Sequence, residues 1–267
     1  MAPRIIFSHG NSFPASTYGV VLDSLRDRGF QVDAVEKYGH DPRYPVTNNW
    51  PNLVQQLADF AREKQGQSEP AFLVGHSLGG ILSLMCAARH PELARGVLLI
   101  DSPVLGGWRA TTLGLAKRTA LVGSVSPGRI SQKRRNHWPS AQDAWDNFIG
   151  KKTFARWDPQ VLRDYIDHGT HDEGGQRVLS FDRDVETAIY NGLPHKIDSL
   201  LKRKPLKCPV AFIGGTQSAE MRQAGSELTH KVVKGRIMMI EGTHLFPMEK
   251  PLATAAAIEA SLRNLGI

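Results

Sequence analysis

Short apolar runs alternate with stretches of helical periodicity over the first hundred residues of the chain. The runs at residues 4–8, 30–35, 71–74 and 96–100 each have the length of a short buried strand. Between them, apolar residues recur at spacings of three and four, as they do on one face of an amphipathic helix. This alternation predicts a parallel sheet with helices packed on both of its faces.

The same pattern predicts where the helices lie and where the sheet resumes. A proline or a glycine marks one end of several of the helical stretches, in agreement with the usual start and stop signals. Two more strands and a last amphipathic helix are expected in the C-terminal quarter. The expected helices are a stretch around Leu22 and Leu25 closed by Gly29, residues 47–64, Leu78 to His90, and a helix from about Pro251, and the late strands are 210–213 and 236–240.

The alternation breaks between about residues 102 and 205. This stretch has a helical and loop-rich pattern with several prolines, and it predicts no strand. Inside an α/β chain, a segment of this length is expected to be an inserted helical cap rather than a structureless loop. We therefore expect a core domain formed by residues 1–101 and 206–267, with a cap formed by 102–205. Its aromatic residues either line a substrate pocket or pack the cap's own core (Trp108, Trp138, Trp145, Phe148, Phe154, Trp157, Tyr165, Tyr190).

Length and composition are those of a globular protein, with 267 residues of which 41% are hydrophobic and 22% charged. No apolar run approaches the length that crosses a bilayer, and the apolar start is too short for a signal peptide. The two cysteines, Cys86 and Cys208, have neither metal spacing nor an evident disulfide partner. We therefore expect a cytoplasmic protein without a membrane partner.

The net charge of +7 is unevenly distributed. Residues 102–160 contain ten Lys or Arg against three Asp, which accounts for the whole excess. Such a segment either steers anionic substrates or acidic partners toward the protein, or is a solvated helical face. No nucleic-acid motif accompanies it, so we expect no nucleic-acid partner.

The strand predicted from Ala71 ends abruptly in Gly75-His76-Ser77-Leu78-Gly79, and a helical pattern starts immediately after the serine. A serine between a strand end and a helix start must adopt strained backbone angles, which requires small neighbours two positions away on either side. Gly75 and Gly79 meet that requirement. The turn places the Ser77 hydroxyl clear of the sheet and near the positive end of a helix. Ser77 is therefore the candidate nucleophile.

Two other polar motifs follow predicted strands, His9-Gly10-Asn11 and Gly242-Thr243-His244. Open α/β sheets bind their ligands at this end of the strands. The three motifs together resemble those of the α/β-hydrolase family over essentially the whole chain. The resemblance implies an α/β-hydrolase fold with a mostly parallel sheet of about six strands, helices on both faces and an inserted helical cap. Many relatives have an antiparallel hairpin before the first parallel strand, but here His9 is reached after only one predicted strand, so we do not expect that hairpin.

A serine hydroxyl is a weak nucleophile unless a base accepts its proton, and histidine titrates close enough to neutral pH to do so. We assign Ser77 as the nucleophile and His244 as the base that later protonates the leaving group. The resemblance also implies that the main-chain N–H groups of Asn11 and Leu78 bind the oxyanion.

The acid that orients His244 has two candidates. In this family it usually follows the strand that we expect at 210–213, but Ser218 and Ala219 occupy that place here. Asp101 ends the preceding strand, a position from which some relatives supply the acid, and it is favoured. Glu220 comes one or two residues late but has a longer side chain, and it remains the alternative acid.

The remaining histidines near these motifs are expected to have structural roles. His76 is a structural neighbour of the nucleophile, and His9 supports its own loop by hydrogen bonding. His168 and His171 lie in a polar stretch that lacks the pattern of a third ligand, so we expect a polar loop rather than a metal site.

The sequence thus predicts a serine hydrolase that cleaves a small-molecule ester or thioester through an acyl-enzyme, with no metal or cofactor. The same residues would serve a lactone hydrolase, a perhydrolase or a carbon–carbon bond hydrolase. Outside enzymes, the alternative is a ligand-binding protein on this fold. A serine at position 77 argues against dehalogenase or epoxide-hydrolase chemistry, which uses an aspartate there. An anionic or aromatic substrate would match the composition of the cap, and the oligomeric state is left open.

Overall fold

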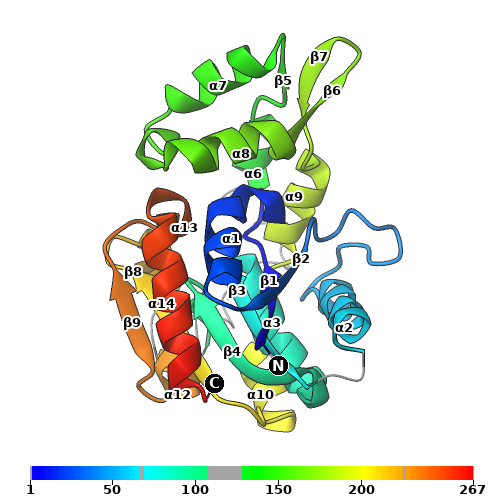
Figure 1. Cartoon of the computed structure of the whole chain (residues 1–267). Coiled ribbons are helices and arrows are strands. Elements are labelled where there is room, and N and C mark those ends of the chain that lie inside the picture. The colour runs from blue at the N-terminus through cyan, green and yellow to red at the C-terminus, as the bar shows by residue number, and fades with distance from the viewer. Residues whose placement is uncertain (1, 67–68, 107–127, 225–226, 267) are drawn as a thin grey trace.

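A six-stranded sheet forms the centre of the molecule in the computed structural model, which describes residues 2–66, 69–106, 128–224 and 227–266 (Figure 1). The strand order is β2-β1-β3-β4-β8-β9 and every pairing is parallel. The expected parallel sheet of about six strands is therefore confirmed. Its strands are β1 (Arg4–Ser8), β2 (Gln31–Val35), β3 (Ala71–His76), β4 (Ala94–Ile100), β8 (Val210–Gly215) and β9 (Ile237–Ile240).

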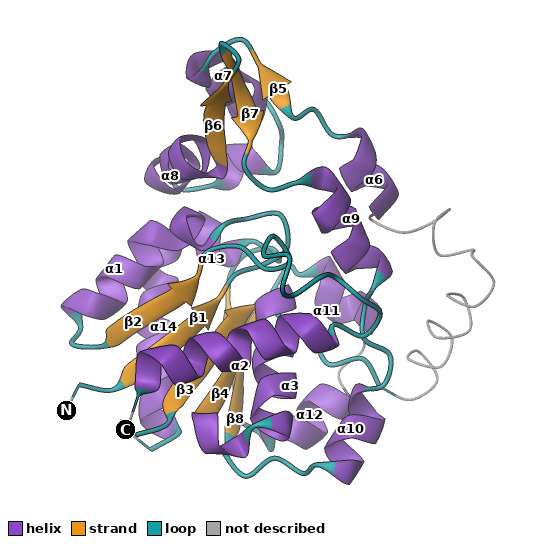
Figure 2. Cartoon of the chain, turned by 90° about the vertical axis from the view of Figure 1, so that its right-hand side faces the viewer, coloured by secondary structure: helices purple, strands orange, loops and turns teal. Residues whose placement is uncertain are grey.

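Helices cover both faces of this sheet (Figure 2). Successive side chains of a strand point to opposite faces, so Ile5 and Phe7 pack into one core and Ile6 into the other. One face is covered by α1 (Gly19–Asp27) and α14 (Pro251–Asn264), and the other by α2 (Pro51–Gln65), α3 (Leu78–Arg89), α10 (Ile197–Arg203) and α12 (Glu227–Val233).

In the part of the chain that the structure describes, no helix combines the length and apolar composition needed to cross a bilayer.

The order of the strands places the functional motifs next to one another. The chain runs from β1 outward to β2 and then returns to β3 on the other side of β1. Where the strand order reverses in this way, the carboxyl ends of the strands border a crevice. Ser8 at the end of β1 is paired with Gly75 near the end of β3, so the loop at 9–13 lies beside the turn that contains Ser77.

Residues 102–209 form an insertion between β4 and β8, and most of its described part lies beyond the carboxyl ends of the strands (Figure 1). Alongside its helices it contains a three-stranded antiparallel sheet of order β5-β7-β6. The described elements before α10 are α6 (Gly128–Lys133), β5 (His137–Trp138), α7 (Ala141–Ile149), α8 (Pro159–Gly169), β6 (Thr170–Glu173), β7 (Gln176–Leu179) and α9 (Arg183–Asn191).

The expectation of a segment without strands was wrong. Gly174 and Gly175, with φ of 56° and 77°, form a two-residue turn between β6 and β7. Two consecutive glycines in the left-handed region match the twist of a tight antiparallel hairpin. The expectation of a polar loop around His168 and His171 was also wrong. His168 belongs to α8 and His171 to β6.

The described aromatic residues of the insertion mainly pack against one another. Trp138 and Phe148 have ring centroids 5.2 Å apart, and Phe148 and Tyr165 are also 5.2 Å apart. Trp157 joins the group, and the four side chains are buried in one core with the residues under α1. Of the two interpretations, packing therefore applies to these four residues, in a core that the insertion shares with the main domain. Trp108 lies outside the described residues.

Candidate active site

Ser77 lies on a tight turn between β3 and α3, with φ of 53° and ψ of −113°. A Cβ atom on Gly75 would lie 2.2 Å from the carbonyl carbon of Gly79. A Cβ atom on Gly79 would lie 2.0 Å from the carbonyl oxygen of Ser8. Both distances are far below van der Waals contact. The turn can therefore close only with glycine at position 75, and can pack against β1 only with glycine at position 79.

The structure brings Ser77, His244 and Asp101 together from the loops that follow β3, β9 and β4. His244 Nε2 lies 3.0 Å from Ser77 Oγ, and His244 Nδ1 lies 2.7 Å from Asp101 Oδ2. Asp101 is fully buried and also accepts hydrogen bonds from the Gly215 N–H at 2.7 Å and the Ser218 hydroxyl at 2.5 Å. This arrangement allows the histidine to take a proton from the serine while the carboxylate fixes its orientation.

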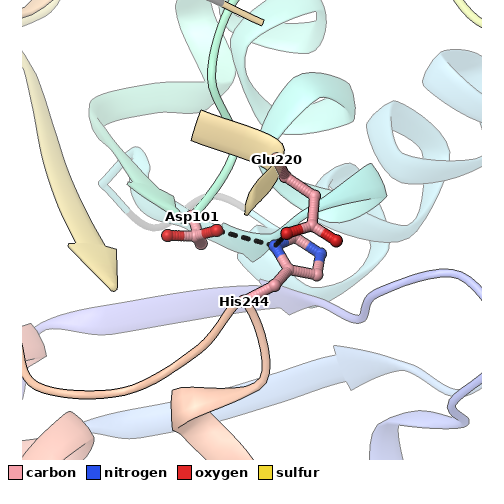
Figure 3. A group of neighbouring side chains, drawn as sticks. All are labelled: Asp101, Glu220 and His244. Carbon is pink, nitrogen blue, oxygen red and sulfur yellow. Dashed lines mark hydrogen bonds and ion pairs between the residues drawn. The ribbon is translucent and has the colours of Figure 1, made fainter. Parts of the chain in front are cut away.

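Glu220 lies near the same ring nitrogen, at the distance of an ion pair rather than of a hydrogen bond (Figure 3). Its Oε2 atom is 3.9 Å from His244 Nδ1, and its side chain is 49% exposed. Asp101 is closer and completely shielded from water, so the geometry favours Asp101 over Glu220 as the partner of His244. Ser218 occupies the place where the family usually has its acid, and its hydroxyl donates to Asp101 instead. This role was not predicted from the sequence, and the only signal for it was the polar side chain at that position.

Asp101, Glu220 and His244 are also the one group of potential metal ligands, among the residues with described positions, whose ligand atoms lie within 4.8 Å of one another. Asp101 and His244 are already hydrogen-bonded to each other there. His168 and His171 belong to no such group in the described part of the chain.

The two expected oxyanion donors border a small cavity next to Ser77. Leu78 is the first residue of α3, so its N–H has no acceptor within the helix. Asn11 lies in the loop after β1.

His9, at the start of the same loop, is fully buried. Its Nδ1 atom lies 2.8 Å from the Gly10 carbonyl oxygen, and its Nε2 atom accepts the Tyr38 N–H at 3.0 Å. Burial lowers the pKa of His9 to about 4, so it is neutral and holds the loop.

A family model described as the alpha/beta hydrolase family matches residues 5–257. The chain belongs to the alpha/beta hydrolase family. An esterase of Mycobacterium tuberculosis is 36% identical over 247 residues, which cover 91% of this chain and 75% of that protein. A serine hydrolase-like protein of Dictyostelium discoideum is 22% identical over 94% of this chain and 72% of its own length. The crystal structure of E-2-(acetamidomethylene)succinate hydrolase has a TM-score of 0.76 at 20% identity, covering 98% of this chain and 92% of that one.

His76 connects the two loops that border Ser77 in this alpha/beta hydrolase. Its Nε2 donates to the His244 carbonyl at 2.9 Å, and its Nδ1 accepts the Tyr18 hydroxyl at 2.7 Å. Tyr18 Oη in turn accepts the Gly10 N–H at 2.9 Å. Burial, and then the nearby His244, lower the pKa of His76 to about 3. A neutral His76 therefore links the His244 loop to the loop after β1.

Two cavities of different character meet at Ser77 and His244. The smaller one, of about 130 Å³, has a mainly apolar lining that includes Trp50, Leu78 and Ile81 from the core and Ile189 from the insertion. Its apolar character suits a hydrocarbon group.

The larger cavity, of about 520 Å³, has a mixed lining, in which charged and polar side chains stand beside apolar ones such as Phe13 and Leu245. Arg134 is paired with Glu186 at 3.1 Å and Arg156 with Glu249 at 3.3 Å, so these two positive charges are largely balanced. Lys152 lies at the same cavity and is exposed. Of the other basic residues between 102 and 160, Arg109, Lys117 and Arg118 lie outside the described residues.

Proposed function

We propose that the chain is a serine hydrolase that cleaves a small-molecule ester or thioester through an acyl-enzyme intermediate. The observation that carries this proposal is the continuous hydrogen-bonded series from Ser77 through His244 to Asp101. Membership of the alpha/beta hydrolase family supports it, as does the 36% identity to a protein named as an esterase.

In the proposed reaction, Ser77 Oγ attacks the carbonyl carbon while His244 Nε2 accepts its proton. The N–H groups of Leu78 and Asn11 stabilise the negative oxygen of the tetrahedral intermediate. His244 then returns the proton to the departing oxygen or sulfur, which leaves the acyl group on Ser77. A water molecule, activated by the same histidine, releases the acid. Asp101 keeps His244 in the required tautomer throughout.

The two cavities define the proposed substrate. His244 borders both cavities, but its neighbours Thr243 and Leu245 border only the larger one. We therefore place the leaving group, which must reach the proton on His244, on the side of the larger cavity. The acyl group occupies the small apolar cavity, which has room for a short chain. In this proposal the insertion is a cap domain, because Ile189 and Tyr190 of α9 contribute to the walls of the cavities.

Hydrolysis of p-nitrophenyl esters tests the proposal, with acyl chains from acetyl to decanoyl and Ser77→Ala as the control. We expect turnover of the short esters, a decline for the longest ones, and loss of activity in Ser77→Ala. A fluorophosphonate should label the wild-type protein at Ser77 and not the variant. Wild-type protein that neither hydrolyses an ester nor accepts the label would rule the proposal out. Binding of the p-nitrophenyl esters without their hydrolysis would indicate a ligand-binding protein instead.

A further inference from the structure

Helix α9 of the insertion is tied to the core at both of its ends. Near its C-terminus, the indole N–H of Trp50 donates to the Ile189 carbonyl at 3.0 Å, and the Asn49 N–H donates to the Gly192 carbonyl at 2.8 Å. Near its N-terminus, the Asn11 side-chain amide donates to the Glu186 carbonyl at 3.1 Å. The helix therefore connects the loop after β1 to the turn that precedes α2.

The side chain of Glu186 adds a second connection to the loop after β1. The residue is 3% exposed, and its Oε1 atom accepts a hydrogen bond from the Ser12 hydroxyl. Arg134 Nη1 lies 3.2 Å from Oε1 and 3.1 Å from Oε2, and Arg134 Nη2 donates to the Tyr165 hydroxyl at 3.0 Å. A buried carboxylate is strongly unfavourable unless it is paired and hydrogen-bonded. Glu186 is thus held in one position, between Ser12 and Arg134.

The segment that Glu186 contacts is one whose backbone needs support. Ser12 has φ of 81°, in the left-handed region that non-glycine residues rarely adopt. The preceding residue, Asn11, carries one of the proposed oxyanion donors on its main chain. The direction of that N–H depends on the backbone from Gly10 to Ser12, and Glu186 contacts Asn11 through its carbonyl and Ser12 through its carboxylate.

We propose that Glu186, neutralised by Arg134, is a positioning residue that holds the Asn11 N–H in the orientation that binds the oxyanion. This inference rests on the proposed function, because it requires an oxyanion at that donor. Glu186 acts through the loop and does not touch the reacting atoms. Its effect should fall on the tetrahedral state, since an N–H aimed at the oxyanion contributes little to binding of the uncharged ester.

The test compares kcat, KM and inhibition by an alkylboronic acid, which forms a tetrahedral adduct with the nucleophilic serine, in the wild type and four variants. Glu186→Ala removes the carboxylate, and Ser12→Ala removes only the hydroxyl that binds it. Glu186→Gln keeps an oxygen that accepts from Ser12. Tyr165→Phe is the matched control, because it removes a hydrogen bond at the far end of the same network. Endpoint titration with a fluorophosphonate counts active sites, so kcat refers to folded protein.

We expect Glu186→Ala and Ser12→Ala to lower kcat by about 10- to 100-fold, below the roughly 10² to 10³ that deletion of a whole oxyanion donor costs. The inhibition constant of the boronic acid should rise by a similar factor while KM stays nearly constant. Glu186→Gln should recover most of the activity, and Tyr165→Phe should match the wild type. If Glu186→Ala does not fold, Ser12→Ala carries the same expectation.

Wild-type kcat and boronic-acid affinity in both Glu186→Ala and Ser12→Ala, with normal hydrolysis by the wild type, would overturn the positioning role alone. A rise in KM at constant kcat would overturn it as well, since that result indicates a role in substrate binding. Failure of the wild-type protein itself to hydrolyse esters would overturn the proposed function and this inference with it.

Discussion

Three of the six non-glycine residues with positive φ in the described part of the chain belong to the candidate site. Ser12, Ser77 and Asp101 all have positive φ, with values of 81°, 53° and 42°. Such conformations are unfavourable for residues with a side chain and persist where the surroundings fix them. Here the surroundings are specific contacts: Glu186 holds Ser12, and three hydrogen-bond donors surround the carboxylate of Asp101.

Exchanging each carboxylate for its amide separates the two candidate acids. Asp101→Asn removes the charge that stabilises protonated His244 and favours the wrong tautomer, so we expect kcat to fall by up to about 10⁴, the size of the corresponding loss in a serine protease. Glu220→Gln should leave kcat within about threefold, because Glu220 lies 3.9 Å from the ring nitrogen and is half exposed. Steady-state hydrolysis of a p-nitrophenyl ester measures both.

The comparison needs a check that both variants remain folded, because Asp101 is buried and accepts three hydrogen bonds. Thermal unfolding monitored by circular dichroism provides it. A larger loss in Glu220→Gln than in folded Asp101→Asn would reverse the assignment of the acid.

The sequence was informative where chemistry follows a local pattern. Ser77 lies between two glycines, Asp101 ends a predicted strand and His244 follows another, so the neighbouring residues and the family resemblance were enough to select all three as candidates. Glu186 could not be found in this way. Its partner Ser12 is 174 positions away in the chain, and on a helix of the insertion it resembles any polar residue of an exposed face. Only the folded arrangement shows that it is buried.

At the level of elements, the close contact between α3 and β1 constrains the turn that contains Ser77. Gly79→Ala would bring a methyl group to 2.0 Å from the Ser8 carbonyl oxygen, a backbone atom that cannot move aside easily. We expect a loss of at least about 1–3 kcal/mol in the free energy of unfolding, as for other overpacked sites. Activity should fall by about 10² or more, because a shift of about 1 Å in a reacting group has that effect. Urea unfolding and ester hydrolysis measure the two quantities.

Gly150→Ala is the matched control for this substitution. Gly150 follows α7 with φ of −70°, and a Cβ atom there would be 3.3 Å from the Asp146 carbonyl oxygen, which a small adjustment relieves. It should keep wild-type activity and nearly wild-type stability. Equal behaviour of Gly79→Ala and Gly150→Ala would show that the turn tolerates a side chain and would contradict the steric argument.

Element types were predictable where the chain is periodic and less so in the insertion. Four strands of the main sheet, β1, β3, β4 and β8, are short runs buried along most of their length, so their existence followed from the apolar pattern. The edge strands β2 and β9 are less buried, but each is a short run rich in apolar residues. The strands β5, β6 and β7 have two to four residues each, with exposed positions in all three, and leave little periodicity to detect. The glycine pair at 174 and 175 was the usable signal for this hairpin.

On the scale of the whole molecule, the unevenly distributed charge is partly neutralised by folding. Arg134 and Arg156 of the basic segment are each paired with a glutamate, and Lys151 and Arg135 lie over aromatic rings. The excess of positive charge counted for residues 102–160 therefore overstates the charge that Arg134 and Arg156 present at the larger cavity. Their pairing with distant residues is a property of the fold that composition does not contain.

Buried neutral histidines should make the stability of the whole molecule depend on pH. Burial lowers the pKa of His9 to about 4 and that of His76 to about 3, against 6.5 for the ordinary side chain. Below pH 6.5 the unfolded chain therefore binds protons that the folded protein does not, and the free energy of unfolding falls as the pH decreases. Near pH 5 the slope should reach about 2.7 kcal/mol per pH unit, or about 1.4 for each histidine. Urea unfolding at several values between pH 7 and pH 5 measures it, above the ordinary pKa values of Asp and Glu side chains.

His76→Gln tests whether the buried histidines cause this dependence. A glutamine can still accept from Tyr18 and donate to the His244 carbonyl, but it does not titrate, so the slope near pH 5 should fall by about 1.4 kcal/mol per pH unit. His137→Gln, at an exposed position, should leave the slope unchanged. A wild-type stability that is flat between pH 7 and pH 5 would mean that His9 and His76 take up protons in the folded state. Because a protonated His76 could no longer accept the Tyr18 hydroxyl, such a result would also remove the proposed link between the His244 loop and the loop after β1.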